Sequence, residues 1–305
     1  MTTTLVFLHG RGQEFKDPEK LRRNWLAGLG AGLVRAGLPA GSLDAVPSVL
    51  PFYGNVLFGI TADLARDPLE LESMPDARDE PAPLQPYLPE DVGRLEQRLL
   101  HDMTRSLAPL AQTEPSDADL EGLGAIAEAG RMVLSWDVTR QGLLALARYT
   151  RFDQEVISAH LRDVAVYLTR GRDEVLATVR AGIPAGGSLV LVSHSLGTVV
   201  ACDLLSDPET RDRTRLWVTA GSPLGLEAVQ HNLRPRGPRP VGVDWLTTYD
   251  PKDVVALGHP LRSWGVVRNV RVDNGDSPHA IDRYLSHPVT AGAIAAAATQ
   301  SGQGS

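Results

Sequence analysis

Six short runs of mostly apolar residues recur along the chain, and each has the length of a buried strand. They cover residues 5–8, 43–50, 189–192, 216–219, 245–249 and 266–272. Runs of this kind, separated by longer segments with helical spacing, are typical of strands that helices cover on both faces. The pattern predicts an α/β protein with a mostly parallel sheet and helices on both sides of it.

The segments between these runs have apolar residues at helical spacing. In residues 17–38, apolar residues recur every three or four positions, and Pro18 suits the first turn of a helix. A similar stripe marks residues 152–180, which Gly171 divides. Further helices are predicted at residues 198–205, 280–285 and 291–298, whereas residues 211–215 are predicted to form a charged loop.

Residues 55–150 differ in composition from the rest of the chain. Residues 63–91 are acidic and contain six prolines, and helices are predicted around residues 90–107 and 120–149. A long insertion after the carboxyl end of a strand is typical of a cap over a site. We therefore expect a core formed by residues 1–54 and 151–305, with a helical cap or lid at 55–150. The second cap helix either lines an acyl pocket or packs on a core of its own.

Charge and composition exclude several classes of protein. The 305 residues carry a formal net charge of -7, which argues against a nucleic-acid-binding protein. The one cysteine, Cys202, cannot form an internal disulfide, and no Cys/His cluster has zinc spacing. The chain has no basic leader and no apolar stretch of membrane-spanning length. We expect a cytoplasmic protein with no metal, no cofactor and no transmembrane segment; the pattern does not indicate an oligomeric state.

A short turn joins the strand at 189–192 to the helix at 198–205. It reads Ser193-His194-Ser195-Leu196-Gly197. Such a turn lifts the Ser195 hydroxyl clear of the sheet and directs the Leu196 N–H, at a helix start, toward a developing anion. The turn resembles the nucleophile elbow of the α/β-hydrolase superfamily, with Ser193 in place of the usual glycine. The resemblance implies that Ser195 is a catalytic nucleophile and that Leu196 contributes to an oxyanion hole.

Two further segments are similar to members of this superfamily. The first strand runs into His9-Gly10-Arg11-Gly12, which resembles the strand-then-HG signature of lipases and esterases. That resemblance implies that the backbone N–H of Arg11 is the second oxyanion-hole donor. The segment at 221–225, GSPLG, resembles lipase-like serine hydrolases, including intracellular DDHD-domain phospholipases. The turns supply candidate pocket residues: His9, Gly10, Tyr53, His194, Pro223 and Leu224. Tyr53 has an equally good alternative role as an aromatic residue packed under a loop.

The resemblance also places an acid and a histidine after the last two strands. Asp250 and Asp253 both follow the strand at 245–249. Asp-Pro commonly starts a turn, which favours a structural role for Asp250. Asp253 precedes two valines, as in the usual pattern of the superfamily, and is the favoured acid, with Asp250 as the alternative. His279 follows the last strand and is the implied base. His101 and His160 are expected to be surface or packing residues. His231 precedes the acid, His259 lies too close to it in sequence, and His287 lies too far beyond the last strand to be the base.

These residues together imply acyl transfer through a Ser195-His279-Asp253 triad. The first hypothesis is an esterase or lipase-like hydrolase of a small-molecule, partly hydrophobic acyl substrate, with kcat/KM rising from acetate to at least hexanoate. A thioesterase, amidase or acyltransferase would use the same residues. A non-catalytic binding protein on a hydrolase fold is the third hypothesis, because a fold alone does not establish activity.

Overall fold

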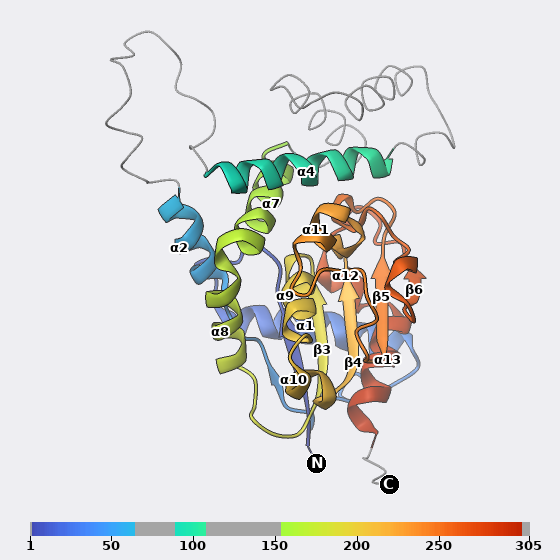
Figure 1. Ribbon diagram of the computed structural model, residues 1–305. Coiled ribbons are helices and arrows are strands. Elements are labelled where there is room, and N and C mark those ends of the chain that lie inside the picture. The colour runs from blue at the N-terminus through green and yellow to red at the C-terminus, as the bar shows by residue number, and fades with distance from the viewer. Residues whose placement is uncertain (1, 65–88, 108–153, 301–305) are drawn as a thin grey trace, which may run out of the picture.

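The computed structural model describes residues 2–64, 89–107 and 154–300 (Figure 1). Six parallel strands form one sheet in the order β2-β1-β3-β4-β5-β6. Their bounds are β1 (Thr3–Leu8), β2 (Ser48–Val49), β3 (Ser188–His194), β4 (Thr214–Ala220), β5 (Trp245–Tyr249) and β6 (Arg268–Arg271). The predicted α/β class with a parallel sheet is confirmed.

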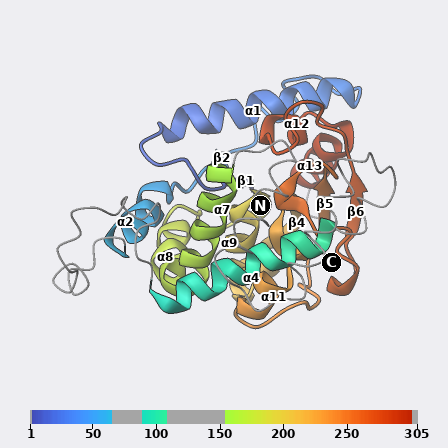
Figure 2. The ribbon, with the colours of Figure 1, turned by 90° about the horizontal axis from the view of Figure 1, so that it is seen from above.

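Helices cover both faces of the sheet (Figure 2). They are α1 (Pro18–Arg35), α2 (Gly54–Leu64), α4 (Glu90–Leu107), α7 (Gln154–Val166), α8 (Arg172–Ala181), α9 (Leu196–Leu204), α10 (Pro208–Arg213), α11 (Glu227–Asn232), α12 (Ile281–Leu285) and α13 (Pro288–Thr299). Helix α1 begins after Asp17, whose side chain accepts a hydrogen bond from the Glu19 N–H at 2.9 Å. None of the described helices is long and apolar enough to cross a bilayer.

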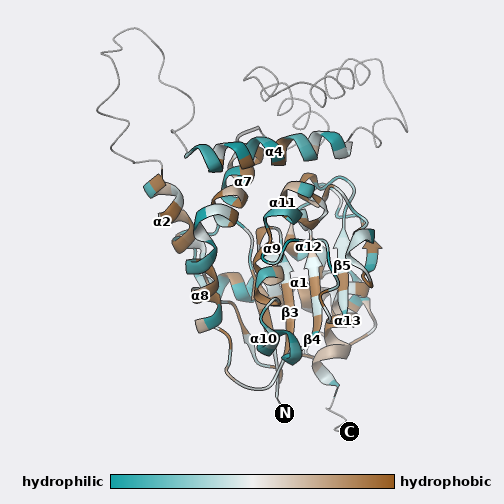
Figure 3. Cartoon of the chain, in the orientation of Figure 1, coloured by the Kyte–Doolittle hydropathy of each residue, from teal (hydrophilic) through white to brown (hydrophobic). Residues whose placement is uncertain are grey.

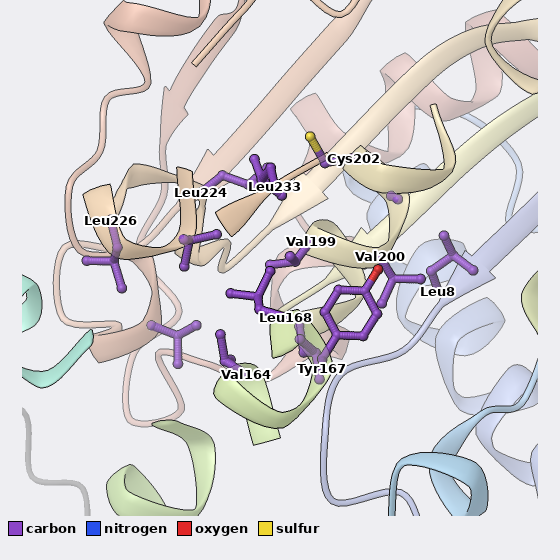
Figure 4. Packing of buried hydrophobic residues seen from close by; sticks show 14 of the residues in the cluster. Leu8, Val164, Tyr167, Leu168, Val199, Val200, Cys202, Leu224, Leu226 and Leu233 are labelled. Atoms are coloured by element: carbon purple, nitrogen blue, oxygen red, sulfur yellow. The ribbon is translucent and has the colours of Figure 1, made fainter. Parts of the chain in front are cut away.

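Alternate residues of the central strands enter two different cores. Val6 and Leu8 of β1 pack with residues of α7, α8 and α9, whereas Leu5 and Phe7 pack with α1 and α13. Figure 4 shows part of the first core, where Tyr167 lies beside Val200 of α9. Because both faces of β1 and β3 are buried, each strand contains a run of four consecutive apolar residues, while α10 and much of α4 are hydrophilic (Figure 3).

Two predicted elements were wrong. The strand expected at residues 43–50 is only the two-residue β2, because residues 39–46 form successive turns in which Ser42, Asp44 and Val46 N–H groups bond carbonyls three residues earlier. The charged loop expected at 211–215 belongs to α10 and the start of β4. Helix α10 forms because Asp207 caps it, accepting a bond from Thr210 N at 2.9 Å, with Pro208 in its first turn.

Most of the other described helices agree with the predicted pattern, but α2 and α11 were not predicted. Helix α4 has the predicted bounds, and the long helix at 152–180 is divided by a π-helical turn, Tyr167–Gly171. The predicted helix at residues 120–149 lies outside the described residues. The last strand is shorter than predicted, at Arg268–Arg271.

The path of the chain creates a topological switch point at the carboxyl ends of β1 and β3. From β1 the chain goes outward to β2, and it then returns past β1 to β3. The connections after β1 and β3 therefore leave in opposite directions, and ligands of open α/β sheets bind outside the carboxyl ends of strands at such a switch point. Helix α4 lies across these carboxyl ends (Figures 1 and 2).

Candidate active site

Ser195 occupies the turn between β3 and α9 in a strained conformation. Its φ is 55° and its ψ is -130°, a region that costs a non-glycine residue about 1–3 kcal/mol. Backbone bonds hold the turn: Ser195 N donates to Ala220 O at 3.1 Å, and Thr198 N donates to Ser195 O at 2.9 Å. The Ser195 Oγ is buried and has no hydrogen-bond partner in the described structure. The strained turn therefore holds a buried hydroxyl that makes no structural hydrogen bond with the described residues.

The residues two positions before and after Ser195 fill the roles expected from the sequence. Ser193 points into the fold, where its Oγ donates to Val218 O at 2.9 Å and accepts from Trp217 Nε1 at 2.9 Å. A Cβ on Gly197 would lie 2.5 Å from His9 O and still closer to Leu8 O. Only glycine lets the start of α9 approach the end of β1 this closely.

The loop after β1 lies directly against the serine. A Cβ on Gly10 would lie 2.8 Å from Ser195 Cβ and 3.2 Å from its Oγ. The loop is tied down by Gln13 Nε2, which donates to Arg11 O at 2.9 Å, and by Arg11 Nε, which donates to Asp163 Oδ2 at 2.6 Å. The backbone at residues 10 and 11 therefore borders the space in front of the hydroxyl.

His9 and Tyr53 support this loop from below. The His9 Nδ1 donates to Gly10 O at 2.7 Å, its Nε2 accepts from Tyr53 N at 3.2 Å, and the Tyr53 hydroxyl donates to His9 O. Burial lowers the pKa of His9 to about 4, so the ring is neutral at pH 7. The sequence allowed Tyr53 either to line a pocket or to pack under a loop. In the structure it packs under the loop, against His9.

Asp253 and His279 form the closest carboxylate–imidazole pair. The Asp253 Oδ2 lies 2.8 Å from His279 Nδ1, and it also accepts from the Tyr284 hydroxyl at 2.7 Å. The Val255 N–H donates to Asp253 Oδ1 at 2.9 Å. Burial by itself would raise the pKa of Asp253, but His279 and these hydrogen bonds together lower it. An ionised Asp253 holds the proton on Nδ1, which leaves Nε2 to act as a base.

Asp250 has a structural role instead. Its Oδ1 accepts from Lys252 N at 2.8 Å, and its Oδ2 accepts from Asn274 N at 2.6 Å. Asp250 thus joins the turn after β5 to the loop after β6. His259 bonds Ala256 O and Thr247 Oγ1, and His287 bonds Asn274 Oδ1.

Gly221, the first residue of the GSPLG segment, makes room for the acid–base pair. Its φ is +55°, and a Cβ there would lie 2.6 Å from Asp253 Oδ2 and 3.1 Å from His279 Nδ1. Pro223 and Leu224 do not border the cavity that contains Ser195. Both are buried, and Leu224 belongs to the core shown in Figure 4.

Ser195 and His279 line the same cavity. It has a volume of about 160 Å³. Its apolar wall comes from Met103 of α4, Ile157 of α7, Val254 and Val255. The remaining lining residues are Gly10, Arg11, Gln13, His160 and His194. A larger hollow of about 730 Å³ lies at the opposite end of β4 and β5, beside Trp245 and Arg268, and contains none of these groups.

Two further histidines surround His279. The His194 Nε2 donates to His279 O at 2.8 Å, and the two rings lie 4.5 Å apart. The ring of His160 meets the His279 ring edge-on at 6.3 Å. Burial lowers the pKa of both His194 and His160 to about 3, which keeps them neutral. The sequence predicted a surface or packing role for His160 and did not place it in the cavity. It also gave no sign that Tyr284 bonds Asp253. Neither residue lies in a recognisable motif.

In the described part of the chain, no group of three or more His, Cys, Asp or Glu residues is placed to hold a metal ion. Comparison of the chain with protein-family models, curated proteins and solved structures gave no match. The chemistry of the site must therefore be argued from its geometry.

Proposed function

We propose that this chain is a serine hydrolase with an α/β-hydrolase fold that cleaves a small carboxylic ester through an acyl-enzyme. The observation that carries the proposal is the cavity that Ser195 shares with His279, itself bonded to Asp253 at 2.8 Å. A serine on a strand-to-helix turn, followed along the chain by an acid and then a histidine, is the order of that superfamily.

Each group has a defined role in this mechanism. His279 Nε2 takes the proton of Ser195 as its Oγ bonds to the ester carbonyl carbon, and Asp253 stabilises the imidazolium that forms. The N–H groups of Leu196 and Arg11 bind the carbonyl oxygen as it becomes negative. His279 then gives its proton to the departing alcohol. A water molecule, deprotonated in turn by His279, releases the acid from Ser195.

The size of the cavity favours a short acyl group. Because the cavity measures only about 160 Å³, we expect a butanoyl group to suit it better than the hexanoyl or longer group expected from the sequence. Because Met103, Ile157, Val254 and Val255 give it an apolar wall, lengthening acetate to butanoate should raise kcat/KM.

Steady-state hydrolysis of 4-nitrophenyl acetate, butanoate and hexanoate by the purified protein tests the proposal. The expected rates peak at butanoate. Ser195→Ala should lose at least a thousandfold in kcat, by analogy with other serine nucleophiles. Ser42→Ala, which removes an exposed hydroxyl bonded to Pro39 O, is the matched control and should be fully active.

Matched thioester and anilide substrates distinguish ester cleavage from thioesterase and amidase activity. If the thioester or the anilide is turned over faster than the matched ester, the protein is a thioesterase or an amidase instead. Ester hydrolysis that is undiminished in Ser195→Ala would overturn the assignment of the nucleophile.

A further inference from the structure

His160 is a buried polar residue that the mechanism above does not use. Only 6% of its surface is exposed, and it lines the cavity that contains Ser195. Its one ring contact is the edge-on approach to His279, and it makes no hydrogen bond with any residue in the described ranges. A neutral imidazole in the wall of a cavity can form a hydrogen bond with a molecule bound there, which gives this buried polar residue a possible function.

The other polar side chains of the cavity wall already have partners. Arg11 Nε is bonded to Asp163, Gln13 Nε2 to Arg11 O, and His194 Nε2 to His279 O. Ser195 Oγ is unpartnered in the described structure, as expected of a nucleophile that waits for substrate. His160 is therefore a wall residue with a hydrogen bond to offer and with no bonded partner among the described residues.

The charge state of His160 limits what it can bind. Burial, the neighbouring His279 and the guanidinium of Arg11 lower its pKa to about 3. A neutral imidazole carries one N–H donor and one acceptor nitrogen. The N–H of this ring can donate to an acceptor oxygen of a bound molecule.

We propose that His160 donates a hydrogen bond to an oxygen that the substrate carries close to its scissile carbonyl. The preferred substrates are then short esters with an ether, hydroxyl or carbonyl oxygen beside the ester group, and not simple alkyl esters. This inference rests on the proposed hydrolase function and makes His160 a specificity-determining residue of the same site.

A pair of isosteric substrates tests this inference on the acyl side. Methoxyacetyl differs from butanoyl by one oxygen in place of one methylene, so 4-nitrophenyl methoxyacetate and butanoate occupy the same space. We would measure kcat/KM for both with the wild type and with His160→Phe. Comparing the ether-to-alkyl ratio between the two proteins cancels the intrinsic reactivity of the esters. The ratio should fall about tenfold in His160→Phe, the effect of one neutral hydrogen bond.

Three variants control for general damage to the site. His160→Gln keeps an N–H donor and should retain most of the wild-type ratio. Met103→Leu changes the apolar wall and should leave the ratio unchanged. If His160→Phe does not fold, as judged by its thermal midpoint, His160→Leu takes its place in the same comparison.

The alcohol side is tested with 2-methoxyethyl acetate and butyl acetate. A His160-dependent preference in either pair supports the inference and locates the oxygen on the acyl or the alcohol part. Equal losses on both members of both pairs would overturn it and leave His160 as a packing residue. An inactive wild type would instead overturn the proposed function, which labelling of Ser195 by a fluorophosphonate tests separately.

Discussion

At the scale of single residues, the site depends on three close backbone approaches. Gly10 lies against the Ser195 side chain, Gly197 lies against the carbonyls that end β1, and Gly221 lies against Asp253 and His279. At each position a Cβ would come within 3 Å of another atom. These glycines bring the ends of β1, β3 and β4 close enough for residues far apart in the chain to share one cavity.

Gly221→Ala should therefore damage the acid–base pair. The new methyl group would lie 2.6 Å from Asp253 Oδ2, so the carboxylate must move away from His279. We expect kcat to fall by about a hundredfold, because small displacements of catalytic groups are costly. Gly275→Ala is the matched control: its φ is +66°, but a Cβ there meets nothing within 4 Å.

Both variants should lose about 1 kcal/mol of stability from the left-handed backbone. Only Gly221→Ala should lose activity. Equal activity in the two purified variants would mean that Gly221 does not support the pair.

The two candidate acids should respond differently to the same substitution. Asp253→Asn should lower kcat by about a thousandfold or more, because an amide does not hold the imidazole in the required tautomer. Asp250→Asn should mainly lower the unfolding free energy, by about 1–2 kcal/mol, because one of its two backbone N–H partners loses a charged acceptor. Measuring kcat beside urea unfolding for both variants checks the assignment, and a reversed pattern would make Asp250 the acid.

At the scale of elements, helix α7 both lines the Ser195 cavity and holds the loop after β1. It contributes Ile157 and His160 to the cavity, and its Asp163 bonds Arg11 Nε at 2.6 Å. The ion pair is mostly buried, with side-chain exposures of 24% and 17%. Because the Arg11 N–H is the proposed oxyanion donor, α7 fixes the position of that donor.

Asp163→Asn should therefore reduce kcat without an equal rise in KM. We expect a loss of about tenfold, since the loop is displaced and not removed. Asp91→Asn breaks the exposed pair that Asp91 forms with Arg170 and is the control; exposed pairs contribute little. A change confined to KM would show that Asp163 acts on substrate binding instead.

The strands and turns of the site could be predicted from sequence because their chemistry is local. An apolar run that ends in Ser193-His194-Ser195-Leu196-Gly197 strongly favours a strand followed by a tight turn into a helix. Asp253, followed by two valines, lies in the turn after β5. His160 and Tyr284 lie on helices whose apolar stripes show only that they pack. Their contacts with His279 and Asp253 arise from the packing of α7 and α12 against the sheet edge, which no local pattern records.

At the scale of the whole molecule, buried histidines make stability depend on pH. Burial lowers the pKa of His9 and His259 to about 4, and that of His160 and His194 to about 3. Their unfolded pKa is about 6.5. Unfolding therefore takes up protons between about pH 6.5 and 4. The contribution of these neutral rings to the unfolding free energy is fully present above about pH 6.5, and it is lost as the pH falls.

Three carboxyl groups that are buried or partly buried oppose this trend. Burial raises the pKa of Glu96, Asp102 and Asp163, so the folded state protonates them before the unfolded state does. The pKa shifts of the four histidines are the larger ones, and we expect the unfolding free energy to fall by several kcal/mol from pH 7 to pH 5.

Urea unfolding across this range measures the effect. His259→Gln should make the dependence shallower by about 1.4 kcal/mol per pH unit near its steepest part, the effect of one proton. His259 does not line the Ser195 cavity, so the comparison isolates stability from activity. Stability that is constant from pH 7 to pH 5 would contradict the neutral state of these rings.

The most direct test of the central claim is to find where a fluorophosphonate binds covalently. Such a probe reacts with a serine only where a base activates it and donors hold the developing anion. Mass spectrometry of the intact protein should show one adduct, and peptide mapping should place it on Ser195. Ser195→Ala should show none, and His279→Ala should react far more slowly. An adduct on a different residue, or undiminished labelling of Ser195→Ala, would contradict the account.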